Sequence, residues 1–206
     1  MSYFFDVCVN LISTFLVFII SWLFYKLLAK NPLLSYFSKN KPSVNRHYYK
    51  LSCSPDGKDH FDTFLSNGYV AIAWPKIGDL TNLIGKSENE IRKTIREKLE
   101  LKYPMKNTTT GQVAGYFYKL LSMKPKDILV LPGKNELYIC QVTKGYSYSE
   151  SEDSTSHRIK IDTKNGIKIP LDGTKNITPR FKKAAQNRLT LISLDDYSAQ
   201  IEELIN

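Results

Sequence analysis

The residues best suited to bind a ligand lie in two short segments that alternate along the chain. Tyr146 and Tyr148 are separated by one residue, so a β-strand would place both rings on the same face. A second segment, His157–Ile161, alternates basic and apolar side chains and includes Arg158 and Lys160. Tyrosine rings stack on planar bases, and basic side chains bind phosphate groups. The two segments therefore predict a wet, basic, tyrosine-bearing sheet face that could bind a nucleobase or a phosphate.

The sequence contains no set of residues with the spacing of a known catalytic site. The three histidines, His47, His60 and His157, are scattered, and there is no phosphate loop or dinucleotide fingerprint. Gln141 and Lys144 could belong to a restriction-type nuclease, but they are three residues apart and so lie on opposite faces of a strand. We therefore expect a binding protein rather than an enzyme, with neither a metal ion nor a cofactor.

The composition is that of a folded protein with an excess of positive charge. The 206 residues include 29 Lys and Arg against 20 Asp and Glu, which gives a formal net charge of +9. Such an excess favours association with nucleic acid or anionic lipid. Cys8, Cys53 and Cys140 lack the spacing of metal ligands, which favours a reduced, cytosolic domain.

An uncharged run, Val7–Tyr25, is long enough to cross a bilayer as a helix. A cleaved signal peptide is the alternative, but Met1–Asp6 contains no Lys or Arg. Lys26 and Lys30 follow the run, and the positive-inside rule then places the remainder of the chain in the cytoplasm. We therefore predict a single-pass protein of the cell inner membrane. Its predicted parts are a transmembrane anchor (1–30), a juxtamembrane linker (31–45) and a cytoplasmic domain (46–206).

Both strands and helices must position the ligand-binding residues. Strands are predicted at His47–Cys53, Gly68–Pro75, Asp127–Leu131, Leu137–Val142, Tyr146–Ser149, His157–Ile161, Ile167–Leu171 and Arg188–Leu194. Helices are predicted at His60–Leu65, Glu88–Lys102, Thr110–Met123 and Thr178–Gln186, and after a cap at Asp195 or Asp196. Ser87 and Glu90 have the spacing of a capping box. The consecutive strands from Lys126 to Ile161 form a β-meander, and the whole pattern predicts an α+β fold.

Five short motifs follow one another through the predicted domain. They are Gly68–Pro75, Ile77–Leu80, Lys124–Val130, Gly145–Tyr148 and His157–Lys160. Their order resembles a PUA-like domain, in the form fused to Mrr-type restriction endonucleases and related to the EVE and ASCH groups. The resemblance covers about Tyr48 to Leu194 and implies a strongly bent β-barrel with flanking helices, here behind the N-terminal transmembrane helix. Lys126 departs from the family pattern, which has Gly before the Asp, and no nuclease domain follows.

The resemblance also implies an aromatic pocket, because relatives of this family bind modified bases or RNA. The candidate pocket residues are Trp74, Tyr146, Tyr148, His157 and Arg158, and the basic strand adds Lys160. Trp74 stands at the end of a predicted strand, where a tryptophan more often covers the core than binds a ligand. Its binding role is therefore one of two alternatives.

Together, these features predict a membrane-anchored cytoplasmic sensor that binds a nucleotide, a cyclic oligonucleotide or a modified nucleic acid. By analogy alone, the sensor would be a membrane effector in bacterial antiphage defence and would form a homo-oligomer on activation. The alternative is an anchored structural or adaptor protein whose basic domain binds a protein or the lipid surface.

The uncharged run Val7–Tyr25 predicts where the full chain will be found in a cell. We expect it in the membrane pellet after a carbonate wash, because an apolar helix of this length partitions into hydrocarbon. A shortened chain that starts at Arg46 is the control and should stay in the soluble fraction. Release of the full chain by carbonate, or cleavage of its C-terminal domain by protease outside intact cells, would contradict the predicted topology.

Overall fold

The strand β3 (Ile128–Pro132) is apolar on both faces, a pattern typical of a strand covered on both sides. In the computed structural model, which describes residues 46–150 and 154–206, Leu129 and Leu131 pack into one hydrophobic core. Ile128 and Val130, which point the other way, pack into a second core. The two cores therefore lie on opposite faces of one sheet.

Seven strands form this sheet, which lies in the compact unit Val44–Asn206. The order along its path is β2-β5-β4-β3-β1-β7, and β6 pairs with the free edge of β4. The remaining strands are β1 Tyr48–Leu51, β2 Tyr69–Ile72, β4 Glu136–Tyr148, β5 His157–Ile161, β6 Ile167–Pro170 and β7 Leu191–Ser193. β1 runs parallel to β3, whereas the other pairs are antiparallel, so the sheet is mixed.

β4 is the long strand that holds the sheet together. Its first half pairs with β3 and β6, and its second half, from Val142, pairs with β5. Register shifts between Val142 and Lys144 and between Lys144 and Tyr146 interrupt the second half, and bulges of this kind bend and twist a strand. The prediction of two separate strands here is wrong, because the bulged chain continues through Gly145 without leaving the sheet.

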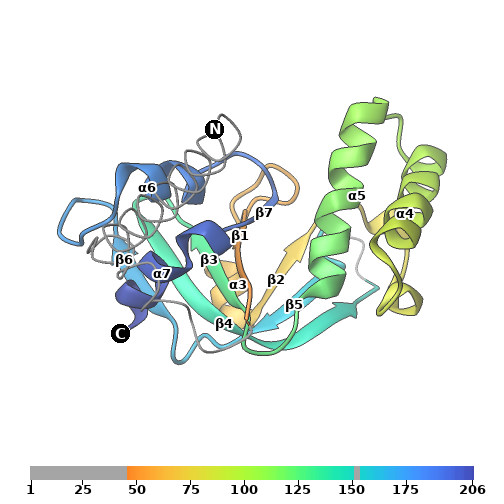
Figure 1. Cartoon of the computed structure of the whole chain (residues 1–206). Helices are drawn as coiled ribbons and strands as arrows, with labels where there is room; N and C mark the ends of the chain where they lie inside the picture. Colours follow the sequence, from red (N-terminus) through yellow and green to blue (C-terminus); the bar gives the residue numbers. More distant parts are fainter. Residues whose placement is uncertain (1–45, 151–153) are drawn as a thin grey trace, which may run out of the picture. The chain divides into compact units, whose positions relative to one another are not determined.

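Helices cover both faces of the sheet. Those that contribute to the first core are α3 Phe61–Asn67, α4 Glu88–Lys102 and α5 Asn107–Ser122. Those of the second core are α6 Pro179–Ala185 and α7 Ser198–Ile205. The described residues also form three short 3-10 helices in the connecting segments: η1 Pro75–Ile77, η2 Thr81–Leu83 and η3 Asp195–Tyr197. Figure 1 shows α4 and α5 as a hairpin on one side of β1, with α6 and α7 on the other side.

The helix predicted at Glu88–Lys102 is confirmed as α4, and the Ser87 hydroxyl accepts the Glu90 amide at 3.3 Å as the capping box requires.

α5 packs closely against α4 through two glycines. A Cβ at Gly111 would lie 3.0 Å from a guanidinium nitrogen of Arg96, and one at Gly115 would lie 2.9 Å from a guanidinium nitrogen of Arg92. The glycines that weaken the helix by propensity therefore give two arginine side chains room to lie on it.

Two parts of the predicted fold need correction. The bent β-barrel is wrong: the sheet is open, and its end strands β2 and β7 are at opposite ends of the path. The wet sheet face is also wrong for the central strands, because helices cover both of their faces.

The predicted transmembrane helix, Val7–Tyr25, lies outside the described residues. Within residues 46–150 and 154–206, no helix is long and apolar enough to cross a membrane. The fold is α+β, with an open mixed sheet and flanking helices.

Lys126, which departs from the PUA-like pattern, has a backbone conformation that favours glycine. Its φ is 82°, in the left-handed region where a Cβ crowds the backbone. The Lys126 amide donates to the carbonyl of Val142 at 2.9 Å, which holds this turn in place before β3. The turn therefore carries local strain.

We expect Lys126→Gly to raise the free energy of unfolding by about 1 kcal/mol, because glycine adopts a positive φ without the Cβ clash. Lys134→Gly is the matched control, since Lys134 is exposed in the β3–β4 turn and is not among the described residues with positive φ. This control should lose stability instead. Urea unfolding of the full chain measures both, and a loss of stability in Lys126→Gly would show that the turn is unstrained.

Candidate functional site

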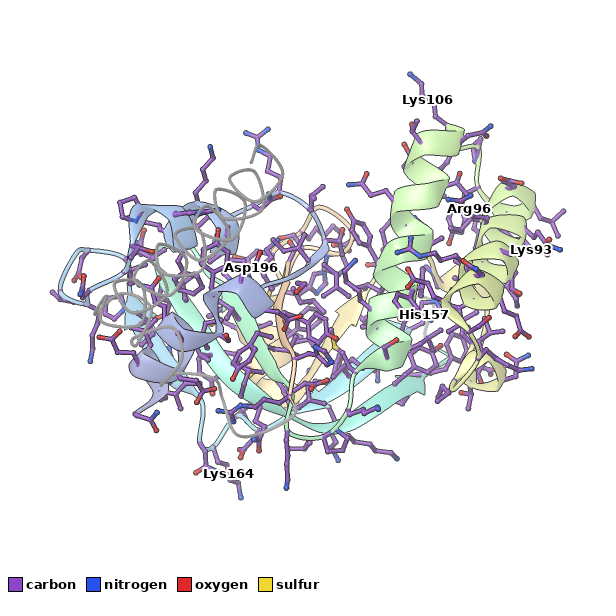
Figure 2. All side chains as sticks on the ribbon, in the orientation of Figure 1. Lys93, Arg96, Lys106, His157, Lys164 and Asp196 are labelled. Atoms are coloured by element: carbon purple, nitrogen blue, oxygen red, sulfur yellow. The ribbon has the colours of Figure 1, made fainter. Side chains whose placement is uncertain are left out.

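Four of the six predicted ligand-binding residues come together in one aromatic cluster: Trp74, Tyr146, Tyr148 and His157. The His157 ring centroid is 6.0 Å from that of Tyr146 and 5.3 Å from that of Tyr148. Phe117 of α5 packs edge-on against His157 at 4.8 Å and lies 6.0 Å from Trp74. Figure 2 shows His157 beside the lower end of α5. The cluster thus fills the space between the sheet and α5.

The hydrogen bonds of this cluster fix the proton on one nitrogen of His157. Nε2 lies 3.1 Å from the carbonyl oxygen of Trp74, which can only accept, so Nε2 carries the proton. Nδ1 is then the acceptor for the Tyr146 hydroxyl at 2.9 Å. The same hydroxyl accepts the Leu80 amide at 3.2 Å. Every polar side-chain atom of His157 and Tyr146 is therefore used inside the protein.

Burial rules out direct ligand contact for two of the predicted residues. His157 is 0% exposed and Tyr146 is 7% exposed. Burial lowers the pKa of His157 to about 4, although its bond to the Trp74 carbonyl acts in the opposite direction. The sequence carried a signal for this, because His157 shares its strand face with Ile159 and Ile161, both of which are in the core.

The other predicted residues lie at or beyond the edge of the cluster. Trp74 is half-buried in the left-handed region at φ 73°, and Tyr148 is half-buried with its hydroxyl 3.5 Å from the Pro75 carbonyl. Arg158 packs over the ring of Tyr69 at 4.3 Å. Lys160 is exposed. The structure therefore brings neither basic residue to the aromatic cluster, because both alternate to the opposite face of β5 from His157.

A groove of about 610 Å³ that the sequence did not reveal lies between the α4–α5 hairpin and the strands β1 and β7. Its lining residues are His47, Tyr49, Ile84, Gly85, Lys86, Glu88, Ile91, Tyr118, Lys119, Leu121, Ser122, Met123, Lys124, Ser193 and Asp195. Small-molecule sites have volumes of about 300–1,000 Å³ and are mostly apolar with a few polar groups. The groove has the size and composition of such a site.

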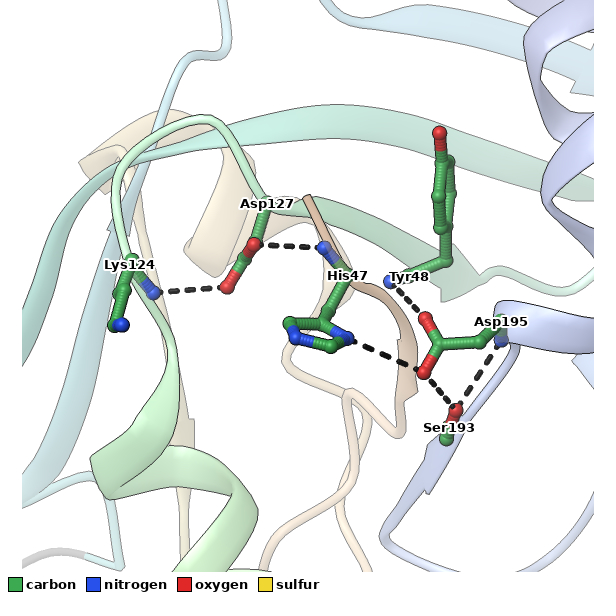
Figure 3. A network of polar contacts seen from close by, with 6 residues as sticks. All are labelled: His47, Tyr48, Lys124, Asp127, Ser193 and Asp195. Atoms are coloured by element: carbon green, nitrogen blue, oxygen red, sulfur yellow. Dashed lines mark hydrogen bonds and ion pairs between the residues drawn. The ribbon is translucent and has the colours of Figure 1, made fainter. Parts of the chain in front are cut away.

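Asp195 organises the polar wall of the groove (Figure 3). Its Oδ2 accepts the Ser193 hydroxyl at 2.9 Å and lies 3.3 Å from Nδ1 of His47, while its Oδ1 accepts the Tyr48 amide at 2.8 Å. Ser193 and His47 thus bind the same carboxylate oxygen rather than each other. Because the histidine does not accept the Ser193 hydroxyl, the three residues do not form a serine–histidine–aspartate triad. Asp195 was expected to cap the final helix. Its side chain instead accepts the amide of Tyr48, the first residue of β1.

Asp127 holds the chain on the neighbouring side of the groove (Figure 3). Its side chain is 3% exposed, and its two oxygens accept the amides of His47 at 2.9 Å and Lys124 at 2.8 Å. These two bonds place His47 and Lys124, which both line the groove. The described residues contain no group of three or more His, Cys, Asp or Glu side chains that could hold a metal ion.

The helix side of the groove is cationic. Lys86 is paired with Glu90 at 3.2 Å, but Lys119 and Lys124 form no ion pair with any described residue. Burial, and then the charge of Arg92, lower the pKa of Lys119, while Glu88 has the opposite effect. Lys119 is therefore a partly buried cation without a bonded carboxylate, which favours an anionic ligand.

Arg92 supports this side of the groove from α4. Its Nε lies 2.6 Å from Glu88, and its guanidinium lies 5.5 Å from the ring centroid of Tyr118. Glu88 and Tyr118 both line the groove, so Arg92 holds an acidic and an aromatic lining residue together. Sequence reasoning missed the groove because its walls come from four segments that are distant in the chain.

The buried neutral His157 predicts a loss of stability in mild acid. In the unfolded chain its pKa is near 6.5, whereas burial lowers the folded pKa to about 4. The unfolded state therefore binds more protons between these values, and the free energy of unfolding falls as the pH drops from 6.5 to 4. We expect a loss of about 3 kcal/mol from this group.

His157→Gln is the matched control, because a glutamine amide can also donate to the Trp74 carbonyl and accept from Tyr146. Urea unfolding of both proteins at pH 7 and pH 4 measures the difference. Equal losses in the two proteins would show that His157 does not titrate on unfolding.

Comparison with known proteins gives a family for the chain. No curated protein matches it, and no solved structure does. The PUA-like resemblance therefore remains a prediction without a supporting match. One family model, described as Domain of unknown function (DUF8426), matches residues 49–185. This match covers more than half of the chain and spans β2 to α6. It includes the aromatic cluster and the α4–α5 side of the groove. The chain belongs to the DUF8426 family.

Proposed function

We propose that this protein is a binding module for a nucleotide-class ligand, and that the groove between α5 and β1 is the binding site. The ligand class is the one expected from the sequence: a nucleotide, a cyclic oligonucleotide or a modified nucleic acid. The proposal moves the site away from the aromatic cluster of Trp74, Tyr146, Tyr148 and His157. That cluster is internal and has its buried polar atoms paired.

One observation carries the proposal: the groove is lined by two lysines without carboxylate partners among the described residues and by two tyrosines. Lys119 and Lys124 can bind phosphate oxygens, and the partly exposed ring of Tyr118 offers a surface for a base. Ile91 and Leu121 supply apolar lining between them. A nucleotide has the same division into an anionic part and a flat, weakly polar part.

A sensor fits this site better than an enzyme, because Ser193, Asp195 and His47 are not arranged as a catalytic triad. The sensor role in bacterial antiphage defence, and oligomerisation on activation, remain predictions from analogy alone.

Removal of the two groove lysines should separate specific binding from general attraction to positive charge. We expect Lys119→Ala with Lys124→Ala to weaken nucleotide binding at least ten-fold, because hydrogen bonds to charged groups each contribute about 1.5–3 kcal/mol. The measurement is calorimetric titration of the full chain with the four nucleoside 5′-monophosphates, cyclic dinucleotides and short single-stranded oligonucleotides.

Lys93→Ala with Lys164→Ala is the control, since it removes the same charge from exposed positions that do not line the groove. Figure 2 places Lys93 on the outside of α4 and Lys164 on the turn between β5 and β6. This control should bind almost as well as the natural chain. Equal losses in both double variants, with a steep salt dependence, would indicate a nonspecific polyanion surface and overturn the proposal.

A further inference from the structure

Tyr49 is a buried side chain whose hydroxyl has no hydrogen-bond partner among the described residues. It lies on β1 and lines the groove, with 6% of its surface exposed. Its hydroxyl forms no hydrogen bond with any described residue. Other buried tyrosines differ: the hydroxyl of Tyr48 donates to Glu202 at 2.5 Å, and that of Tyr138 donates to the Thr163 carbonyl at 2.8 Å. The hydroxyl is not enclosed, so it reaches the groove with its donor unused by the described residues and is available to bond a ligand there.

The surroundings of Tyr49 keep its hydroxyl in the donor form. Burial raises the pKa of Tyr49 above its ordinary value, and the carboxylates of Asp127 and Asp195 raise it further. The phenol therefore keeps its proton throughout the physiological range. Both carboxylates already accept hydrogen bonds from other groups: Asp127 binds two amides, and Asp195 binds Ser193, Tyr48 and His47.

The same carboxylates decide which part of a ligand can reach Tyr49. An anionic oxygen beside Asp127 and Asp195 would be repelled, whereas an uncharged acceptor such as a ring nitrogen or a carbonyl would not. Of the lysines without carboxylate partners, Lys119 lies on α5, and Lys124 lies in the turn between α5 and β3. The groove therefore has a neutral donor on β1, a cation on α5 and a second cation in the turn before β3.

We propose that the Tyr49 hydroxyl is the specificity-determining donor of the groove: it binds an uncharged acceptor atom on the planar ring of the ligand, while Lys119 and Lys124 bind the anionic groups. This inference rests on the proposed nucleotide-class function and adds the orientation of the ligand and the atom type that is read. A site that hydrogen-bonds one ligand atom rejects analogues that lack it, because its own polar group is then left unpaired.

The test compares a nucleotide with an anion that has no ring. Tyr49→Phe keeps the buried ring and removes only the hydroxyl. In the full chain we expect this variant to bind the best of the four nucleoside 5′-monophosphates about five-fold more weakly, as for the loss of one neutral hydrogen bond. Its affinity for inorganic pyrophosphate should be unchanged. Lys119→Ala should weaken binding of both probes.

Tyr138→Phe is the matched control, because its hydroxyl is bonded outside the groove and the variant loses a hydrogen bond of the fold instead. It should lower the melting temperature and leave both affinities unchanged. If Tyr49→Phe binds the monophosphate as well as the natural chain does, the Tyr49 hydroxyl forms no hydrogen bond with the ligand. The inference then fails, while the proposed function stands. If Tyr49→Phe weakens both probes equally, its effect is structural and the inference also fails. If the natural chain binds pyrophosphate but no nucleotide, the proposed function and the inference fail together.

Discussion

Two aspartates fix the start of β1, and the rest of the structure depends on this attachment. β1 is a central strand between β3 and β7, but no hairpin joins it to either neighbour. Asp127, at the start of β3, accepts the His47 amide, and Asp195, after β7, accepts the Tyr48 amide. Successive amides are thus held by carboxylates from the two neighbouring strands. This fixes the register of β1 and places Tyr49 on the first-core face, beneath the groove.

The parts of the fold that local sequence patterns specify were predictable. α4 has a capping box and an apolar stripe at helical spacing, so its bounds follow from the sequence. β3 has a continuous apolar run, which identified it as a strand, and its burial on both faces agrees with that pattern. β4 was harder, because Gly145 and the neighbouring polar residues look like a strand end, whereas two bulges carry the strand onward. Closure into a barrel is a property of the whole sheet and leaves no local pattern.

The site was less predictable than the fold, for a physical reason. Local alternation showed which residues share a face, as for His157 with Ile159 and Ile161, but not which face α5 would cover. Tyr146 and His157 therefore looked available for binding and are instead bonded to each other inside the core. The groove depends on a tertiary contact that joins His47 to Asp195 across most of the described chain. No spacing rule connects residues that far apart.

The parallel pairing of β1 also sets the order in which the molecule can fold. The two aspartate bonds to β1 connect residues separated by 80 and 147 positions, and contacts of such long range form slowly because a large loop must close first. The α4–α5 and β3–β4 hairpins need only neighbouring segments and can form early on the ribosome. β1 leaves the ribosome before them but has no partner on either side until β3 and β7 have been made. The groove is thus completed only after β7 has been made, and chains that stop before β7 would lack it even when their hairpins are native.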